Sequence, residues 1–183
     1  MINFKAKPIH PVNIMKIDGA GYRTKTPANF VELESNSYSD VLALSRAAML
    51  WDKENNKKET FASAIFSDFV DDYTKPEFKF FAVTKQMEGF DRLNPDDILG
   101  IAEVKPLTSK MQELVLLQTR PRDKFISQNR KYTEVGRNLV ESIISLFPKK
   151  DLLVEPLVEA RDFYFKLGFK SQILSRFLRF YAR

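Results

Sequence analysis

The stretch ARDFYFKLGF, at residues 160–169, decides how the rest of the chain is interpreted. Apolar residues recur at helical spacing here, namely Leu157, Ala160, Phe163, Tyr164 and Leu167. Pro156 suits a first helical turn, and Gly168 suits the left-handed position just past a helix end. The spacing therefore predicts a short helix over residues 160–167, with a strand on either side. An aromatic stripe on such a helix is most often core packing only.

Composition sets limits on the class of protein. A length of 183 residues, with 44% hydrophobic and 29% charged residues, is typical of one globular domain. There is no apolar run long enough to span a membrane, and the first residues lack the apolar core of a signal peptide, so we expect a cytoplasmic protein. The chain has no cysteine and a single histidine, and we expect no metal site. A net charge of +5 fits an anionic partner without identifying one.

The first part of the chain is rich in turn-forming residues. Three prolines and two of the six glycines fall within residues 1–27. A strand-like segment at residues 12–17, followed by a turn at 18–21, predicts either a hairpin at a sheet edge or a loosely held arm. We therefore treat residues 1–27 as an N-terminal extension or hairpin and residues 28–183 as a single domain. His10, beside a proline, is expected at a flexible or turn position and not as a ligand.

The remaining segments alternate in a definite order. A weak strand at 28–33 precedes a helix at 39–55, capped by Ser39 or Asp40, and a helix from Thr60 to about residue 73. Three extended segments follow at 78–85, 97–105 and 113–119, the last apolar on both sides and therefore central. A turn is expected at 107–112. An irregular basic stretch at 120–131 leads to an amphipathic helix at 135–147, a strand at 152–155, the 160–167 helix and a final strand at 176–182.

This order, together with the pattern A-x-x-F-Y-x-x-L-G-F, resembles the GNAT superfamily of acyl-CoA-dependent N-acetyltransferases. The resemblance implies an α+β (α/β) fold with a mixed, mostly antiparallel sheet, splayed in the middle and covered by helices on both faces. It also implies that the strands at 114–119 and 152–155 are parallel neighbours. The acyl thioester would lie between them.

The resemblance extends to a cofactor site. The family segment [QR]-x-x-G-x-[GA] matches Lys131-Tyr132-Thr133-Glu134-Val135-Gly136, with Glu134 in place of the first glycine. Leu157 likewise replaces an asparagine common in the family. The N–H groups at a helix start have no intrahelical partner and favour anions, so the pyrophosphate of acetyl-CoA is expected there. The predicted cofactor-binding residues are Leu117, Gln118, Thr119, Lys131, Tyr132, Thr133, Glu134, Val135, Gly136 and Arg137, the first three through their backbone.

The resemblance also implies catalytic roles. Tyr164 is expected to protonate the departing thiolate, since a phenol is a suitable acid for it. The base that deprotonates the amine is expected to be Glu103 or Glu113, with Glu155 as a third candidate. The expected reaction moves an acetyl group directly from acetyl-CoA to a primary amine, and the absence of cysteine agrees with direct transfer.

Two other interpretations stay open. One is a catalytically inactive GNAT-like protein that binds acyl-CoA or a partner, which Glu134 favours. The other is a nucleic-acid-associated module, which rests on the basic run at 120–131 and on Arg176, Arg179 and Arg183. The acceptor is open among amino acids, polyamines, antibiotics, peptide termini and aminoacyl-tRNA. Nucleic acid is otherwise not expected as a partner, nor is a membrane, and a homodimer stays open.

Overall fold

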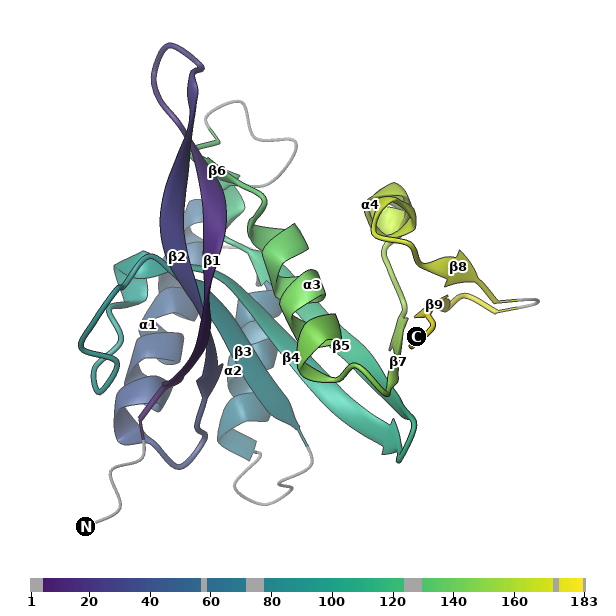
Figure 1. Ribbon diagram of the computed structural model, residues 1–183. Helices are drawn as coiled ribbons and strands as arrows, with labels where there is room; N and C mark the ends of the chain where they lie inside the picture. Colours follow the sequence, from purple (N-terminus) through teal and green to yellow (C-terminus); the bar gives the residue numbers. More distant parts are fainter. Residues whose placement is uncertain (1–4, 57–58, 72–77, 124–129, 173–174, 183) are drawn as a thin grey trace.

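The computed structural model describes residues 5–56, 59–71, 78–123, 130–172 and 175–182. The strands of these segments form one sheet, in the order β6-β1-β2-β3-β4-β5-β7-β9-β8 (Figure 1). All described pairs are antiparallel except β5–β7, which is parallel. The strands are β1 (Lys7–Ile17), β2 (Arg23–Leu33), β3 (Lys79–Thr84), β4 (Ile98–Thr108), β5 (Met111–Thr119), β6 (Tyr132–Thr133), β7 (Asp151–Val154), β8 (Lys170–Ser171) and β9 (Leu178–Phe180).

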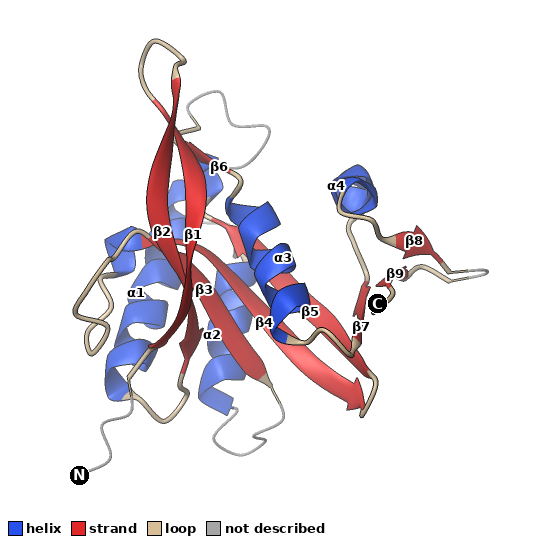
Figure 2. Cartoon of the chain, in the orientation of Figure 1, coloured by secondary structure: helices blue, strands red, loops and turns tan. Residues whose placement is uncertain are grey.

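Helices cover both faces of this sheet. Figure 2 shows α1 (Tyr38–Glu54) and α2 (Phe61–Asp71) behind the strands and α3 (Val135–Leu146) in front, with the short α4 (Arg161–Lys166) beyond β7. The predicted α+β architecture is therefore confirmed. Within the described ranges, no helix is both long and apolar enough to cross a membrane.

Alternation along the strands divides the core into two clusters. In β3, Phe80 and Ala82 pack with α1 and α2, whereas Phe81 and Val83 pack with α3. Successive side chains of a strand point to opposite faces, so one apolar strand fills both clusters. Trp51 of α1 is completely buried in the first cluster. Each such large side chain contributes about 1.5–3 kcal/mol when it leaves water.

A glycine sets how closely α3 approaches the sheet. A Cβ added to Gly100 of β4 would lie 2.7 Å from Val135 Cγ1 and 2.9 Å from Leu139 Cδ1. Both distances are shorter than real Cβ contacts, so α3 occupies the space that a side chain would need. Gly100 therefore fixes the height of α3 above the sheet, and with it the position of the helix start.

Several boundaries differ from the predictions. The residue that caps α1 is Ser37 and not Ser39 or Asp40, since Ser37 Oγ accepts a hydrogen bond from the Asp40 N–H at 3.3 Å. Asp40 is buried instead, and its carboxylate accepts the Glu34 N–H at 3.0 Å. The predicted turn at 107–112 is also too long, because β4 reaches Thr108 and β5 already begins at Met111. Strand pairing between β4 and β5 extends the hairpin into that polar segment.

The N-terminal segment is part of the sheet. Strands β1 and β2 pair from Lys7↔Glu32 to Ile17↔Arg23, and β2 continues without a break through the expected boundary at residue 28. The expectation for His10 was wrong, because this residue lies within β1. Its Nε2 is 3.0 Å from the hydroxyl of Ser142 on α3, and its ring packs on Phe30 with centroids 5.3 Å apart.

Candidate active site

The sheet opens between β5 and β7. These strands pair from Met111↔Asp151 to Leu114↔Val154, where the pairing ends, although β5 runs on to Thr119. The prediction that the two are parallel neighbours is thus confirmed, and Figure 1 shows β7 and α4 diverging from the end of β5. The opening forms a cleft with a volume of about 170 Å³. Its lining residues are Phe61, Leu114, Val115, Leu116, Leu117, Val154, Glu155, Pro156, Leu157, Ala160, Phe163 and Tyr164.

The backbone of β5 presents hydrogen-bonding groups to this cleft. Arg120 donates its N–H to the Leu99 carbonyl of β4 at 2.9 Å. Because backbone groups alternate between the two edges of a strand, Gln118 also faces β4, while Leu117 and Thr119 face the open edge. The side-chain amide of Gln118 donates to the Thr119 carbonyl at 2.6 Å. Of the three residues predicted to pair through their backbone, the geometry therefore favours Leu117 and Thr119 over Gln118.

Tyr164 lines the cleft from α4. Its side chain is only 6% exposed and makes edge-to-face contacts with Phe163 and Phe169, with centroids 5.0 and 5.3 Å apart. Gly168, at φ +92°, reverses the chain so that the Phe169 N–H reaches the Tyr164 carbonyl at 3.1 Å. The role predicted for Gly168 is therefore confirmed. Burial raises the pKa of the Tyr164 phenol, which keeps the hydroxyl protonated at neutral pH but makes it a weaker acid than a phenol in water.

The start of α3 adjoins the same cleft. The first hydrogen bond of the helix runs from the Asn138 N–H to the Glu134 carbonyl at 2.9 Å, so the N–H groups of residues 135–137 precede the intrahelical ladder. A Cβ on Gly136 would lie 3.5 Å from Phe163 Cζ and 3.6 Å from Thr119 Cγ2. Three separate segments, α3, β5 and α4, thus meet at Gly136.

Glu134 holds an unusual backbone conformation before α3. Its φ of 69° and ψ of 0° are left-handed, a region that costs most residues about 1–2 kcal/mol and glycine little. The family pattern has glycine at this position, and the conformation supplies the physical reason. The carboxylate accepts from Arg137 Nε at 2.9 Å, so its negative charge is compensated within the first helical turn.

The residues before Glu134 are part of the sheet. Tyr132 and Thr133 form β6 against β1, and the Ile17 N–H donates to the Lys131 carbonyl at 2.8 Å. The Thr133 hydroxyl is buried and has no hydrogen-bond partner among the described residues. The ammonium groups of Lys131 and Lys85 each lie 5.8 Å from the centre of the Tyr132 ring. Lys85 follows β3, far away in sequence, so no local motif indicates it.

The three candidate bases lie in different settings. Glu103 is completely buried on β4, opposite Leu116 in the β4–β5 register. Glu113 is half-buried at the paired end of β5, opposite Lys105 and Leu153, and does not line the cleft. Glu155 lines the cleft and accepts from Arg176 Nε at 3.0 Å. Glu155 is the third of the bases predicted from the sequence. Among the described residues, however, it is the acidic residue that lines the cleft.

Several arginines that suggested a nucleic-acid surface form structural ion pairs instead. Arg120 is buried and donates to Glu54 from Nε and Nη2, at 2.9 and 2.7 Å, and to the Asp96 carbonyl at 3.0 Å. Arg179 pairs with Asp151 in the same way. Lys124 and Arg183 lie outside the described residues. No group of three metal-ligating side chains comes together in the part of the chain that the structure describes.

Comparisons with known proteins identify the fold. No protein-family model and no curated protein sequence matches the chain. Among solved structures, a candidate GNAT-family acetyltransferase from Desulfovibrio desulfuricans has a TM-score of 0.57 at 15% identity, over 85% of this chain and 99% of that one. A GNAT-family acetyltransferase from Staphylococcus aureus Mu50 has a TM-score of 0.53 at 14% identity, over 85% and 99%. AtaTR bound with acetyl-CoA has a TM-score of 0.52 at 14% identity, over 84% and 92%. The chain therefore has the GNAT fold, the fold of these acetyltransferases.

Proposed function

We propose that the chain is an N-acetyltransferase that moves an acetyl group from acetyl-CoA directly to a primary amine. The observation that supports this is the meeting of three features at one cleft. These are the open backbone edge of β5, the free N–H groups at the start of α3, and the buried phenol of Tyr164. The acetyl-CoA complex of AtaTR, which has the same fold, adds support for the co-substrate.

The cofactor would lie along the open edge of β5. Its pyrophosphate would accept hydrogen bonds from the N–H groups of residues 135–137, with the Thr133 hydroxyl and the Lys131 ammonium beside them. Leu117 and Thr119 would pair with the pantetheine arm. Gly136 has no Cβ, so Phe163 and Thr119, which flank the open edge of β5, lie close to the start of α3. Tyr132, Glu134 and Arg137 would shape this site, through the packing of Tyr132 and the Glu134–Arg137 ion pair.

The reaction needs two proton movements. A neutral amine attacks the thioester carbon, and the Leu117 N–H would stabilise the resulting oxyanion. As the carbon–sulfur bond breaks, Tyr164 would give its proton to the thiolate of CoA. A carboxylate accepts the proton that the amine loses, with Glu103 and Glu113 as the predicted bases and Glu155 as the one that lines the cleft. Replacing each by Gln distinguishes them, since only loss of the true base changes the acidic limb of the pH–rate profile.

The test of the function is Tyr164→Phe, assayed with acetyl-CoA and a panel of primary amines. Only the hydroxyl is lost, so packing against Phe163 and Phe169 should persist. We expect the turnover number to fall by about 10²–10⁴ and the affinity for acetyl-CoA to stay nearly constant, because the proton is needed only as the bond breaks. Undiminished turnover would exclude Tyr164 as the acid. Phe165→Leu, at an exposed position on the same helix, is the control for folding.

The alternative is a GNAT-like protein that binds acyl-CoA without transferring the acyl group. Glu134 favours it, since a carboxylate beside the pyrophosphate weakens binding. The ion pair with Arg137 reduces that charge, and so we place catalysis first. Saturable binding of acetyl-CoA without turnover on any amine would favour the alternative.

A further inference from the structure

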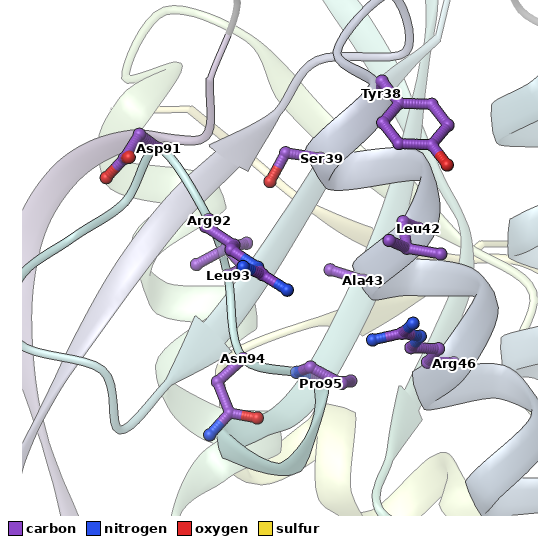
Figure 3. A pocket seen from close by; sticks show the side chains of 10 residues that line it. All are labelled: Tyr38, Ser39, Leu42, Ala43, Arg46, Asp91, Arg92, Leu93, Asn94 and Pro95. Carbon is purple, nitrogen blue, oxygen red and sulfur yellow. The ribbon is translucent and has the colours of Figure 1, made fainter.

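A second and larger hollow lies away from the cleft. It has a volume of about 570 Å³, within the range of about 300–1,000 Å³ typical of small-ligand sites. Its walls are the first half of α1 and the loop between β3 and β4, and it shares no lining residue with the cleft (Figure 3). Its lining residues include Ser39, Leu42, Arg46, Arg92, Leu93 and Pro95.

Two arginines face each other across this hollow. Figure 3 shows the guanidinium groups of Arg46, from α1, and Arg92, from the loop, extending toward the space between the two walls. Neither takes part in an ion pair with another described residue. Asp91 also lines the hollow, but its carboxylate points away from α1 and forms no ion pair with either arginine. The Ser39 hydroxyl is turned toward the loop and has no hydrogen-bond partner among the described residues.

The loop that carries Arg92 has a defined structure. The Gln86 side-chain amide donates to the carbonyls of Glu88 and Gly89 at 2.8 and 2.7 Å, and its Oε1 accepts the Asn94 N–H at 2.8 Å. Leu93, next to Arg92, is only 3% exposed and is anchored in the core beneath α1. The backbone at Arg92 is therefore held opposite α1 by a folded loop, which reduces the entropic cost of ordering this wall around a ligand. The side chains of Arg46 and Arg92 are both exposed to solvent.

We propose that this hollow binds a phosphate monoester that carries an apolar or ring portion, such as a nucleoside monophosphate. A phosphate monoester carries about −1.5 to −2 charges at neutral pH, which matches two guanidinium groups, and each guanidinium offers a planar fork to its oxygens. The Ser39 hydroxyl supplies a further donor. Leu42, Leu93 and Pro95 provide an apolar surface for the rest of the ligand. The site does not depend on acetyl transfer in the cleft.

Calorimetric titration with AMP, adenosine and inorganic phosphate tests the site. We expect AMP to bind saturably, phosphate to bind more weakly, and adenosine to bind the least. Arg46→Ala and Arg92→Ala should each weaken AMP binding by about ten- to hundred-fold, as expected for the loss of hydrogen bonds to a charged group. Arg23→Ala, an exposed arginine on β2 without an ion pair to a described residue, is the matched control and should bind AMP like the wild type.

AMP is also a fragment of CoA, so the Gly136→Asp variant is titrated in parallel. AMP binding should persist there, because Gly136 belongs to the cleft and not to the hollow. The proposal would be overturned by any of three results. These are no saturable binding of AMP or phosphate by the wild type, unchanged affinity in the Arg46→Ala, Arg92→Ala double variant, or loss of AMP binding in Gly136→Asp with retention in the arginine variants.

Discussion

The two faces of the sheet differ in the groups that shape their hollows, which are backbone groups on the α3 face and side chains on the α1–α2 face. On the α3 face, glycines bring elements together, Gly100 beneath α3 and Gly136 beside Phe163 and Thr119, and the first backbone N–H groups of α3 precede its hydrogen-bond ladder. On the α1–α2 face, side chains dominate, with a buried Asp40, the Arg120–Glu54 ion pair and the opposed pair Arg46 and Arg92. A site formed by backbone groups requires small residues such as glycine at fixed positions, and these positions leave a pattern in the sequence. A site formed by side chains from distant segments leaves no such local pattern.

The largest expected effect is on the α3 face, at Gly136. Gly136→Asp should abolish acetyl-CoA binding, because the carboxylate adds like charge and bulk where the pyrophosphate would lie. An acid is tolerated in the first turn of a helix, so the protein should stay folded. Binding is measured by calorimetry and folding by circular dichroism. An unchanged dissociation constant would exclude the proposed phosphate site.

On the α1–α2 face, the expected effect is on stability and depends on pH. Burial raises the pKa of Asp40 from 3.8 to about 6, so folding favours the protonated form. The stabilisation that protonated Asp40 gives the folded state is complete below the pKa of this group in the unfolded chain. It is lost as the pH rises through the pKa of Asp40 in the folded protein. Relative to Asp40→Asn, the wild type should lose on the order of 2–3 kcal/mol of unfolding free energy between about pH 4 and pH 7. Urea titrations at several pH values measure it, and parallel curves for the two proteins would contradict it.

A pair of glycine substitutions separates packing from binding on the α3 face. Gly100→Ala should destabilise the fold by about 1–3 kcal/mol, because its Cβ would overlap Val135 and Leu139 and displace α3. Gly136→Ala meets only ordinary contacts and lies within a helix, so it should raise stability by up to about 1 kcal/mol. Urea denaturation compares them. Equal stability of the two variants would show that Gly100 does not set the height of α3.

The smallest expected effect is at Glu134. Glu134→Gly should stabilise the fold by about 1 kcal/mol, since glycine adopts φ of 69° without strain and the exposed ion pair with Arg137 contributes little. Acetyl-CoA should also bind more tightly, because a carboxylate leaves the phosphate site. Glu134→Gln keeps the strain and removes the charge, so it distinguishes the two causes. Weaker binding in both variants would indicate that the carboxylate takes part in the site.

Sequence patterns foresaw the α3 face in some detail. The A-x-x-F-Y-x-x-L-G-F pattern located the turn at Gly168 and the aromatic wall of the cleft, because a left-handed residue and helical spacing leave a local signature. No such signature marks Lys85, Arg46 or Arg92, since each meets its spatial neighbours only when segments far apart in the sequence come together. His10 was misjudged for the same reason, because it lies in β1, which pairs with β2, and its side chain contacts Ser142 on a distant helix. Local patterns specify backbone geometry, whereas long-range contacts between side chains depend on the assembled fold.

Acetyl-CoA binding is the property on which the proposed function depends most directly. It can be measured by thermal denaturation of the wild-type protein with and without the cofactor. At a hundred times its dissociation constant, a ligand stabilises the folded state by about 2.7 kcal/mol. For a chain of this size, we expect the melting temperature to rise by about 5–10 °C, and not to rise in Gly136→Asp. A melting temperature unchanged by millimolar acetyl-CoA would contradict an acetyl-CoA-dependent function for this cleft.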